Sequence, residues 1–80
     1  MQFLHKGFVM SSNSSQLHIA HKLREARYSI NLSQDEVALK LKRTQSYVSR
    51  CETGNRRLDV LELEEFAKLY KKPLSFFLPS

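Results

Sequence analysis

Apolar residues recur at helical spacing over most of this 80-residue chain, and the spacing predicts an all-α fold. Two stretches carry the longest stripes, one in a helix expected from about residue 15 to residue 29 and one in a helix that Asp59 caps. In each stripe the members stand mostly three or four positions apart, so they share one face of the helix. They are Ile19, Leu23 and Ala26 in the first stretch, and Leu63, Phe66, Ala67 and Tyr70 in the second. We expect these faces to form a small core.

Between these stretches, residues 32–54 predict two short helices joined by a turn. Ser33 is a favourable N-cap, and Glu36 is placed three residues on to complete a capping box. Thr44 caps the next helix, which Gly54 ends by accepting the left-handed conformation. The apolar faces of the two helices are Val37, Ala38 and Leu41, then Val48 and Cys51. Two short helices joined by a turn of about three or four residues form a helix-turn-helix arrangement.

The C-terminal segment is short and apolar. Pro73 is expected to begin a fifth helix, which completes a compact five-helix bundle of residues 15–80 with the helix-turn-helix at its second and third helices. Three consecutive apolar residues point in about three directions on a helix, and one small core covers only part of that arc. We therefore expect Phe76 to turn inward and Phe77 and Leu78 to form a homodimer interface.

The net charge of +5 is concentrated in the first two thirds of the chain. Residues 33–57 hold six lysines and arginines against three carboxylates, a net charge of +3, and residues 1–32 also carry +3, whereas residues 58–80 carry −1. A positive field on the helix-turn-helix and its approaches favours a polyanion as partner. Residues 1–14 are expected to be an N-terminal arm, either flexible or packed on a partner subunit.

The residue content argues against several classes of protein. The single cysteine, Cys51, excludes an internal disulfide and a cysteine-based zinc site of the usual spacing. His5, His18 and His21 have no evident further ligand beside them, so we predict surface histidines, no metal and no other cofactor. No Ser-His-Asp set, glycine-rich phosphate loop or carboxylate pair is visible, so no catalytic residues and no enzyme are predicted. There is no apolar run of roughly 18 residues, so we expect no membrane partner. The single cysteine fits a reducing compartment, and we expect a cytoplasmic location.

The segments SQDEVA and TQSYVSRCETGNRR resemble the lambda-repressor/Cro-type (XRE) helix-turn-helix family. The resemblance covers about residues 23–78, and its specific part is a set of residues at fixed spacings. That set is Leu23, Arg24, Arg27, Leu32, Ser33, Gln34, Ala38, Val48, Glu52 and Gly54. The turn departs from the family, because Lys42 replaces the usual glycine and Arg43 the usual apolar residue. A non-glycine residue at positive φ costs roughly 1 kcal/mol, which a domain can bear.

The resemblance implies a lambda-repressor-like bundle that binds double-stranded DNA, with the third helix in the major groove. Residues expected to contact base edges are Gln45, Ser46, Ser49 and Arg50. Residues expected to contact phosphate are Gln34, Arg43, Tyr47, Asn55, Arg56 and Arg57. A partly buried salt bridge between Arg27 and Glu52 is expected to tie the first helix to the end of the third.

Three functions fit these observations. The first is a sequence-specific transcription regulator that binds a palindromic operator as a homodimer, of the restriction–modification controller or phage and mobile-element repressor type, with no small-molecule effector evident. The second is an antitoxin or protein-interaction module. The third is the DNA-binding fragment of a larger regulator. The sequence does not give the operator or the sign of regulation.

Overall fold

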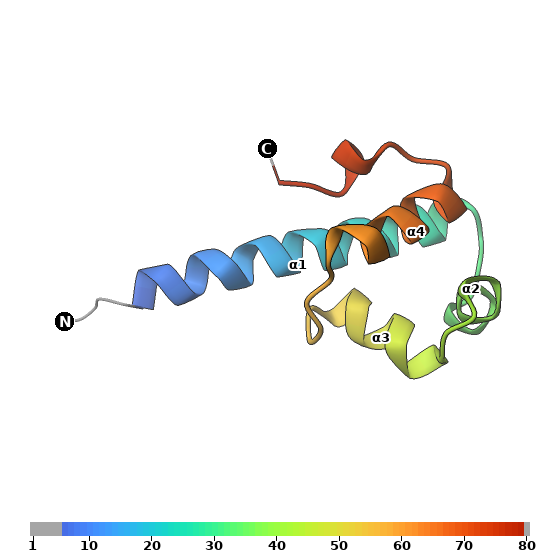
Figure 1. Ribbon diagram of the computed structural model, residues 1–80, viewed down its shortest axis with the longest axis horizontal. Coiled ribbons are helices and arrows are strands. Elements are labelled where there is room, and N and C mark those ends of the chain that lie inside the picture. The colour runs from blue at the N-terminus through green and yellow to red at the C-terminus, as the bar shows by residue number, and fades with distance from the viewer. Residues whose placement is uncertain (1–5, 80) are drawn as a thin grey trace.

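The helices of this protein begin and end where capping residues allow. The computed structural model describes the backbone of residues 6–79 and the side chains of residues 14–79. This part of the chain forms four α-helices followed by one turn of 3-10 helix, arranged as in Figure 1. They are α1 (Lys6–Ser29), α2 (Gln34–Leu41), α3 (Gln45–Thr53), α4 (Val60–Tyr70) and η1 (Leu74–Phe76). The all-α prediction is therefore confirmed.

The prediction of a fifth α-helix is wrong. After Pro73 the chain makes a single 3-10 turn, in which the Phe76 and Phe77 amides donate to the Pro73 and Leu74 carbonyls at 3.0 and 3.1 Å. Pro79 follows within six residues of Pro73, so the segment between the prolines is too short for an extended α-helix.

The first helix begins at Lys6 rather than near Ser15. The serine-rich stretch of residues 11–15 contains no proline or glycine, so nothing in it breaks the helical backbone. The N-terminal part of α1 consequently extends beyond the other helices (Figure 1). The expected division into an arm (1–14) and a domain (15–80) stays a prediction, and the side chains of residues 1–13 lie outside the described residues.

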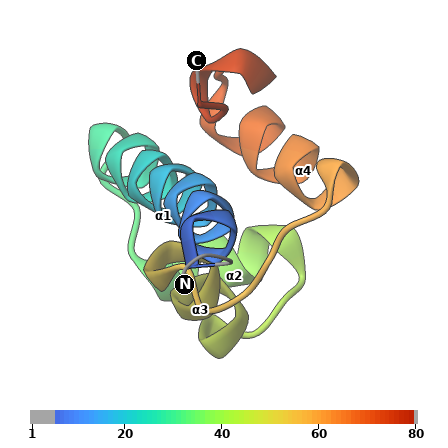
Figure 2. The ribbon, with the colours of Figure 1, turned by 90° about the vertical axis from the view of Figure 1, so that its left-hand side faces the viewer.

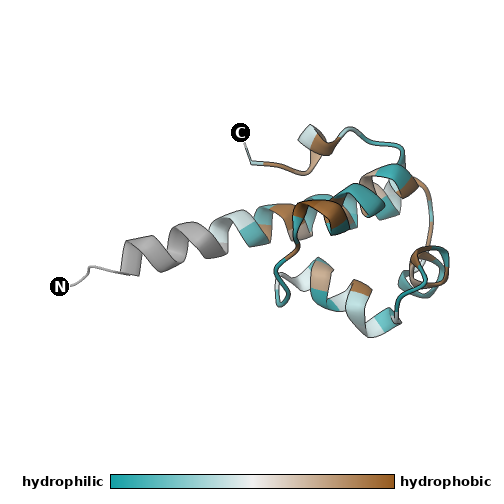
Figure 3. Ribbon diagram, in the orientation of Figure 1, coloured by the Kyte–Doolittle hydropathy of each residue, from teal (hydrophilic) through white to brown (hydrophobic). Residues whose placement is uncertain are grey.

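The helices pack around α1. Seen along α1, helices α2 and α3 lie on one side of it, and α4 with the C-terminal segment lies on another (Figure 2). Apolar and polar residues alternate along the helices, which lets each one turn an apolar face inward (Figure 3). The core gathers residues from α1, α2, α3, α4 and the C-terminal turn. Its fully buried members include Leu23, Val48, Phe66, Tyr70 and Phe77.

The orientation of the C-terminal apolar triplet differs from expectation. Phe77 has no exposed surface and belongs to the core, Phe76 is partly buried against it, and 43% of Leu78 is exposed. The reason is the 3-10 turn, which has three residues per turn and therefore places Leu74 and Phe77 on the same side. Both pack on the core, so Phe77 is not available to a partner subunit in this arrangement.

The helix-turn-helix has the predicted caps. Ser33 and Glu36 form a capping box, with the Glu36 amide donating to Ser33 Oγ at 3.1 Å and the Ser33 amide donating to Glu36 Oε1 at 2.8 Å. Thr44 Oγ1 accepts from the Tyr47 amide at 3.0 Å. Lys42 ends α2 in the left-handed region with φ 58°, which is the conformation that the family glycine would take. The turn therefore keeps its shape, at a local cost of about 1 kcal/mol.

Candidate nucleic-acid interface

One face of α3 is buried and the other is open. Val48 and Cys51 lie in the core, whereas Gln45, Ser46 and Arg50 are exposed. Ser49 lies between the two faces and is half-buried. Within the part of the chain that the structure describes, the side chains of Ser46, Ser49 and Arg50 have no hydrogen bond or ion pair with the rest of the domain. These polar groups are therefore available to an external ligand.

A buried ion pair fixes the other side of α3. Arg27 of α1 and Glu52 of α3 form a bidentate contact, with Nε to Oε2 at 2.7 Å and Nη2 to Oε1 at 2.9 Å. Their side chains are only 10% and 1% exposed. Arg27 Nη1 also donates to the Leu32 carbonyl at 2.9 Å, and the hydrogen bonds that Arg27 donates to the Glu52 carboxylate raise the pKa of the guanidinium. The pair therefore fixes the positions of α1, α3 and the start of the helix-turn-helix relative to one another.

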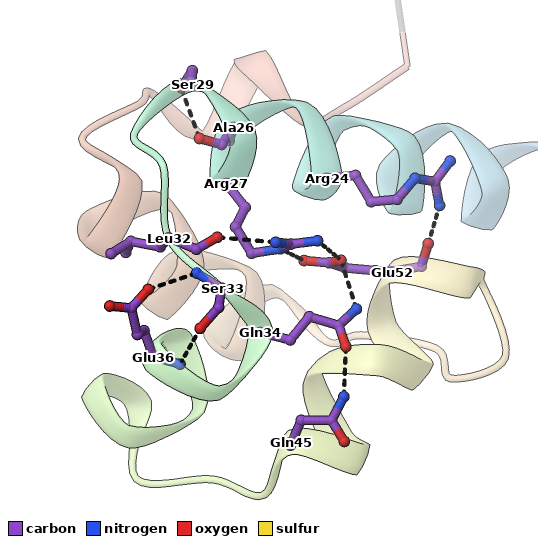
Figure 4. A network of polar contacts seen from close by, with 10 residues as sticks. All are labelled: Arg24, Ala26, Arg27, Ser29, Leu32, Ser33, Gln34, Glu36, Gln45 and Glu52. Atoms are coloured by element: carbon purple, nitrogen blue, oxygen red, sulfur yellow. Dashed lines mark hydrogen bonds and ion pairs between the residues drawn. The ribbon is translucent and has the colours of Figure 1, made fainter.

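Two side-chain amides connect the ion pair to the start of α3 by hydrogen bonds (Figure 4). Gln34 Nε2 donates to Glu52 Oε1 at 3.0 Å, and Gln45 Nε2 donates to Gln34 Oε1 at 2.5 Å. Gln34 was expected to contact phosphate, but its amide is directed at Glu52 and Gln45 in this structure. The chain of contacts fixes which atom of Gln45 is used internally: its amide nitrogen donates to Gln34, and its amide oxygen remains for a ligand.

Arg24 is a site residue to which sequence reasoning gave no role. Its Nη1 donates to the Glu52 carbonyl at the end of α3, as Figure 4 shows. Since the last carbonyls of a helix have no partner within the helix, a guanidinium there satisfies one of them and complements the helix dipole. The signal in the sequence is that Arg24 and Arg27 are three positions apart and share one face of α1.

A second polar cluster surrounds the Tyr47 ring. The guanidinium carbons of Arg43 and Arg56 lie 4.7 and 4.8 Å from the centre of that ring. Glu62 binds both cations, with Oε2 2.9 Å from Arg56 Nη1 and 4.0 Å from Arg43 Nη1. The Tyr47 hydroxyl donates to the same Glu62 oxygen at 3.2 Å, and Arg43 also pairs with Glu65 at 3.3 Å. We call Arg43, Tyr47, Arg56 and Glu62 the Glu62 cluster.

The Glu62 cluster has a defined charge state at neutral pH. The hydrogen bond from Arg56 lowers the pKa of the Glu62 carboxyl, and the amide of Asp59 lowers it further. Burial raises the pKa of the Tyr47 hydroxyl, so this group stays a neutral donor. Two cations, one anion and one phenol therefore meet at the turn before α3 and the loop after it. Arg43 and Arg56 were expected to contact phosphate, and the structure gives both an internal partner.

The remaining predicted phosphate contacts lie in the loop after α3. Asn55 and Arg57 are exposed there, and the Asn55 amide closes the end of α3 by donating to the Arg50 carbonyl at 3.1 Å. Gly54 precedes them with φ 80°, and a side chain at this position would be strained and would meet Leu17 at 3.0 Å. The glycine is therefore needed to turn the loop back along the domain.

Cys51, His18 and His21 play no visible part in this surface. Burial raises the pKa of the Cys51 thiol to about 11, so the group stays protonated in the core. Among the described residues, no three His, Cys, Asp or Glu side chains gather where they would hold a metal ion. His5 lies outside those residues. The described helices include none that is long and apolar enough to cross a membrane.

The arrangement can now be compared with known proteins. The helix-turn-helix domain family matches residues 18–73, which is more than half of the chain. This protein belongs to the helix-turn-helix domain family. The match confirms the resemblance to XRE-like domains that the residues of the turn and its two helices indicated.

Solved structures share the whole fold of the helix-turn-helix domain. The crystal structure of the DNA-binding domain of BldD is 29% identical, with a TM-score of 0.77 over 84% of this chain and 97% of that one. The restriction–modification controller protein C.AhdI from Aeromonas hydrophila is 23% identical, with a TM-score of 0.76 over 82% of this chain and 96% of that one. At that identity C.AhdI shows similarity of fold alone. No curated protein sequence matches the chain closely enough to be counted as a relative.

One further similarity concerns a much longer protein. A crystal structure of Fe(II)-HppE is 20% identical, with a TM-score of 0.75 over 81% of this chain but only 34% of the HppE chain. The shared part is the helical fold. The similarity therefore says nothing about whether this protein shares any property of the rest of the HppE chain.

Proposed function

We propose that this protein is a sequence-specific DNA-binding transcription regulator that binds a palindromic operator as a homodimer. The observation that carries the proposal is the open polar face of α3, whose Ser46, Ser49 and Arg50 have no internal partner among the described residues. The buried Arg27–Glu52 pair holds the opposite side of α3, and a helix that reads bases must be held rigidly. The DNA-binding domain of BldD, which has the same fold, supports the choice of ligand.

In the proposed complex the start of α3 enters the major groove. Arg50 is suited to donate two hydrogen bonds to guanine, and Gln45 presents a free amide oxygen that accepts from the exocyclic amine of adenine. Ser46 and Ser49 can donate to or accept from either base edge. The link from Gln45 through Gln34 to Glu52 pre-orients the Gln45 amide, so less conformational entropy is lost on binding.

Phosphate contacts flank the base-reading face. Arg57 and Asn55 are exposed in the loop after α3, and Arg43 is exposed in the turn before it. These contacts fix the position of the domain but carry no sequence information. Tyr47 and Arg56 of the Glu62 cluster lie beside them and would approach the same backbone. The net charge of +5 supports attraction to a polyanion.

Dimerisation follows from the size of the interface. One small domain contacts only a few base pairs, and its preference for an operator over the many competing sites of a genome would be slight. Two copies on a two-fold axis, with their α3 helices about 34 Å apart, would read a palindrome. Exposed Leu78, beside half-buried Phe76, is the apolar surface that we assign to this contact. No step of this function needs a catalytic residue or cofactor.

Selection of binding sites from random DNA tests the proposal. The wild-type protein is expected to enrich an inverted repeat, and Arg50→Ala is expected to lose roughly 1–3 kcal/mol of specific binding and its preference at one base of each half-site. Lys68→Ala, which removes an exposed cation from the last turn of α4, is the control and should leave the selected sequence unchanged. Failure to enrich any sequence, or an Arg50→Ala variant with the wild-type preference, would contradict the proposed reading.

A further inference from the structure

Glu62 connects four parts of the DNA-facing side through one carboxylate. It accepts from the Asp59 amide at 3.0 Å and so caps α4. It also binds Arg56 from the loop after α3 at 2.9 Å, the Tyr47 hydroxyl of α3 at 3.2 Å, and Arg43 of the turn at 4.0 Å. Only 13% of the Glu62 side chain is exposed, so solvent screens these contacts less than it would on an open surface.

The two arginines held by Glu62 are among the residues that we propose to lie beside the DNA backbone. Their side chains are 34% and 37% exposed, and their guanidinium planes cover the ring of Tyr47 near the start of α3. A guanidinium has five N–H donors, and the Glu62 contact to Arg56 uses one nitrogen, Nη1. Each arginine therefore keeps free donors toward solvent while part of its charge is compensated from inside.

We propose that Glu62 is an intramolecular competitor of the DNA phosphates for Arg43 and Arg56. This inference rests on the proposed DNA-binding function. By compensating two cations at the edge of the interface, the carboxylate weakens the contacts that all DNA sequences share and leaves the base contacts of α3 unchanged. The affinity for operator and for non-operator DNA is lowered to a similar extent, so Glu62 sets the strength of the sequence-independent part of binding.

The test is Glu62→Gln, because glutamine serves equally well at the third position of a capping box. Its single oxygen can accept from the Asp59 amide and from Arg56 Nη1, as Glu62 Oε1 does, and its NH2 group can donate to the Tyr47 hydroxyl. The shape of the cluster is thereby retained while the negative charge is removed. Glu64→Gln is the matched control for the loss of one charge on the same helix, since Glu64 is exposed and has no partner among the residues described. Glu65→Gln, which releases only the second contact of Arg43, is an intermediate case.

Binding to a duplex of random sequence is measured by fluorescence anisotropy over a range of salt concentrations. Glu62→Gln is expected to bind about three- to tenfold more tightly than wild type, since each half-exposed pair that is released contributes up to several-fold. The salt dependence should steepen by about one unit of log K per log salt concentration. Glu64→Gln should change the affinity by less than about twofold, as expected for an exposed charge that solvent screens. On the operator, the gain for Glu62→Gln should be similar, because phosphate contacts carry no sequence information.

The possible outcomes separate this inference from the proposed function. If wild type and Glu62→Gln both fail to bind any DNA, the proposed function is wrong and the inference falls with it. If wild type binds DNA and Glu62→Gln binds equally or more weakly, the proposed function stands and the competition is wrong; Glu62 then orders the arginines for phosphate. Thermal melting of each variant shows that it is folded, and a Glu62→Asp variant, which restores the charge, should return the affinity toward that of wild type.

Discussion

The buried pair of Arg27 and Glu52 provides the sharpest test of how this domain is held together. Glu52→Gln replaces the carboxylate with an amide of nearly the same shape. The Glu52 carboxylate accepts two hydrogen bonds from Arg27 and one from Gln34. After the substitution, the Arg27 guanidinium keeps the Leu32 carbonyl as a partner but loses its counter-charge, at a site where only 10% of its side chain is exposed.

The expected loss is about 3–5 kcal/mol of the free energy of unfolding, because an uncompensated cation is left where water reaches it poorly. A domain of this size has roughly 4–12 kcal/mol in total at the usual 0.05–0.15 kcal/mol per residue, so the loss is a large part of its stability. Each kcal/mol lowers the Tm of a domain of 60–100 residues by roughly 4–8 °C, which predicts a decrease of at least about 12 °C.

Urea and thermal unfolding followed by circular dichroism measure the effect. Glu25→Gln is the control, because Glu25 makes only exposed contacts, at 3.5 Å from Lys22 and 3.8 Å from His21, and should cost about 0–1 kcal/mol. The double variant Arg27→Met/Glu52→Leu removes both charges and should recover most of the stability lost in the single variant. A Glu52→Gln protein as stable as the Glu25→Gln control would refute the view that this pair is desolvated and structurally required.

Three other predictions concern stability and assembly. Phe77→Ala should lower the free energy of unfolding by roughly 3–5 kcal/mol, because it empties a fully buried site. Leu78→Ser should change the free energy of unfolding by no more than about 0.5 kcal/mol and should reduce self-association in sedimentation equilibrium. The reverse pattern would place Phe77 at the subunit contact. Lys42→Gly should stabilise the domain by about 1 kcal/mol, because φ is 58° at this position. Lys40→Gly, inside α2, should destabilise the domain by about as much. Equal denaturation midpoints for wild type and Lys42→Gly would show that the turn carries no strain. The folded-state pKa of Glu62 is lowered, so its contribution to stability is present above its ordinary pKa of 4.5 and is lost as pH falls through the lowered value. The Tm difference between wild type and Glu62→Gln should therefore shrink as the pH falls below 4.5. A Tm difference that stays constant over this pH range would contradict the prediction.

The sequence by itself determined the local structure of the helix-turn-helix. Ser33, Glu36, Thr44 and Gly54 act on backbone groups within a few residues of themselves, so their pattern was sufficient to place the start of α2 and the start and end of α3. The i, i+3 and i+4 spacing of apolar residues likewise determined which face of each helix is buried, because that spacing depends only on helix geometry. The family was recognisable for the same reason: its motif is a set of local spacings.

Only the tertiary structure decided which polar groups satisfy one another. Glu62 follows Tyr47 by fifteen residues and Arg43 by nineteen, and nothing in their spacing indicates that they meet around one ring. The Gln34 side chain was expected to contact a phosphate, but it donates a hydrogen bond to Glu52. A buried carboxylate with an open lone pair is a stronger local partner than solvent.

The C-terminal turn is a further case. A sequence of consecutive apolar residues does not reveal which one is buried, because α and 3-10 geometry direct different members inward. The chain between two prolines took the tighter turn, and this choice placed Phe77 rather than Phe76 in the core. Local spacing thus determined the helices, while contacts between residues far apart in the chain determined the surface that they present.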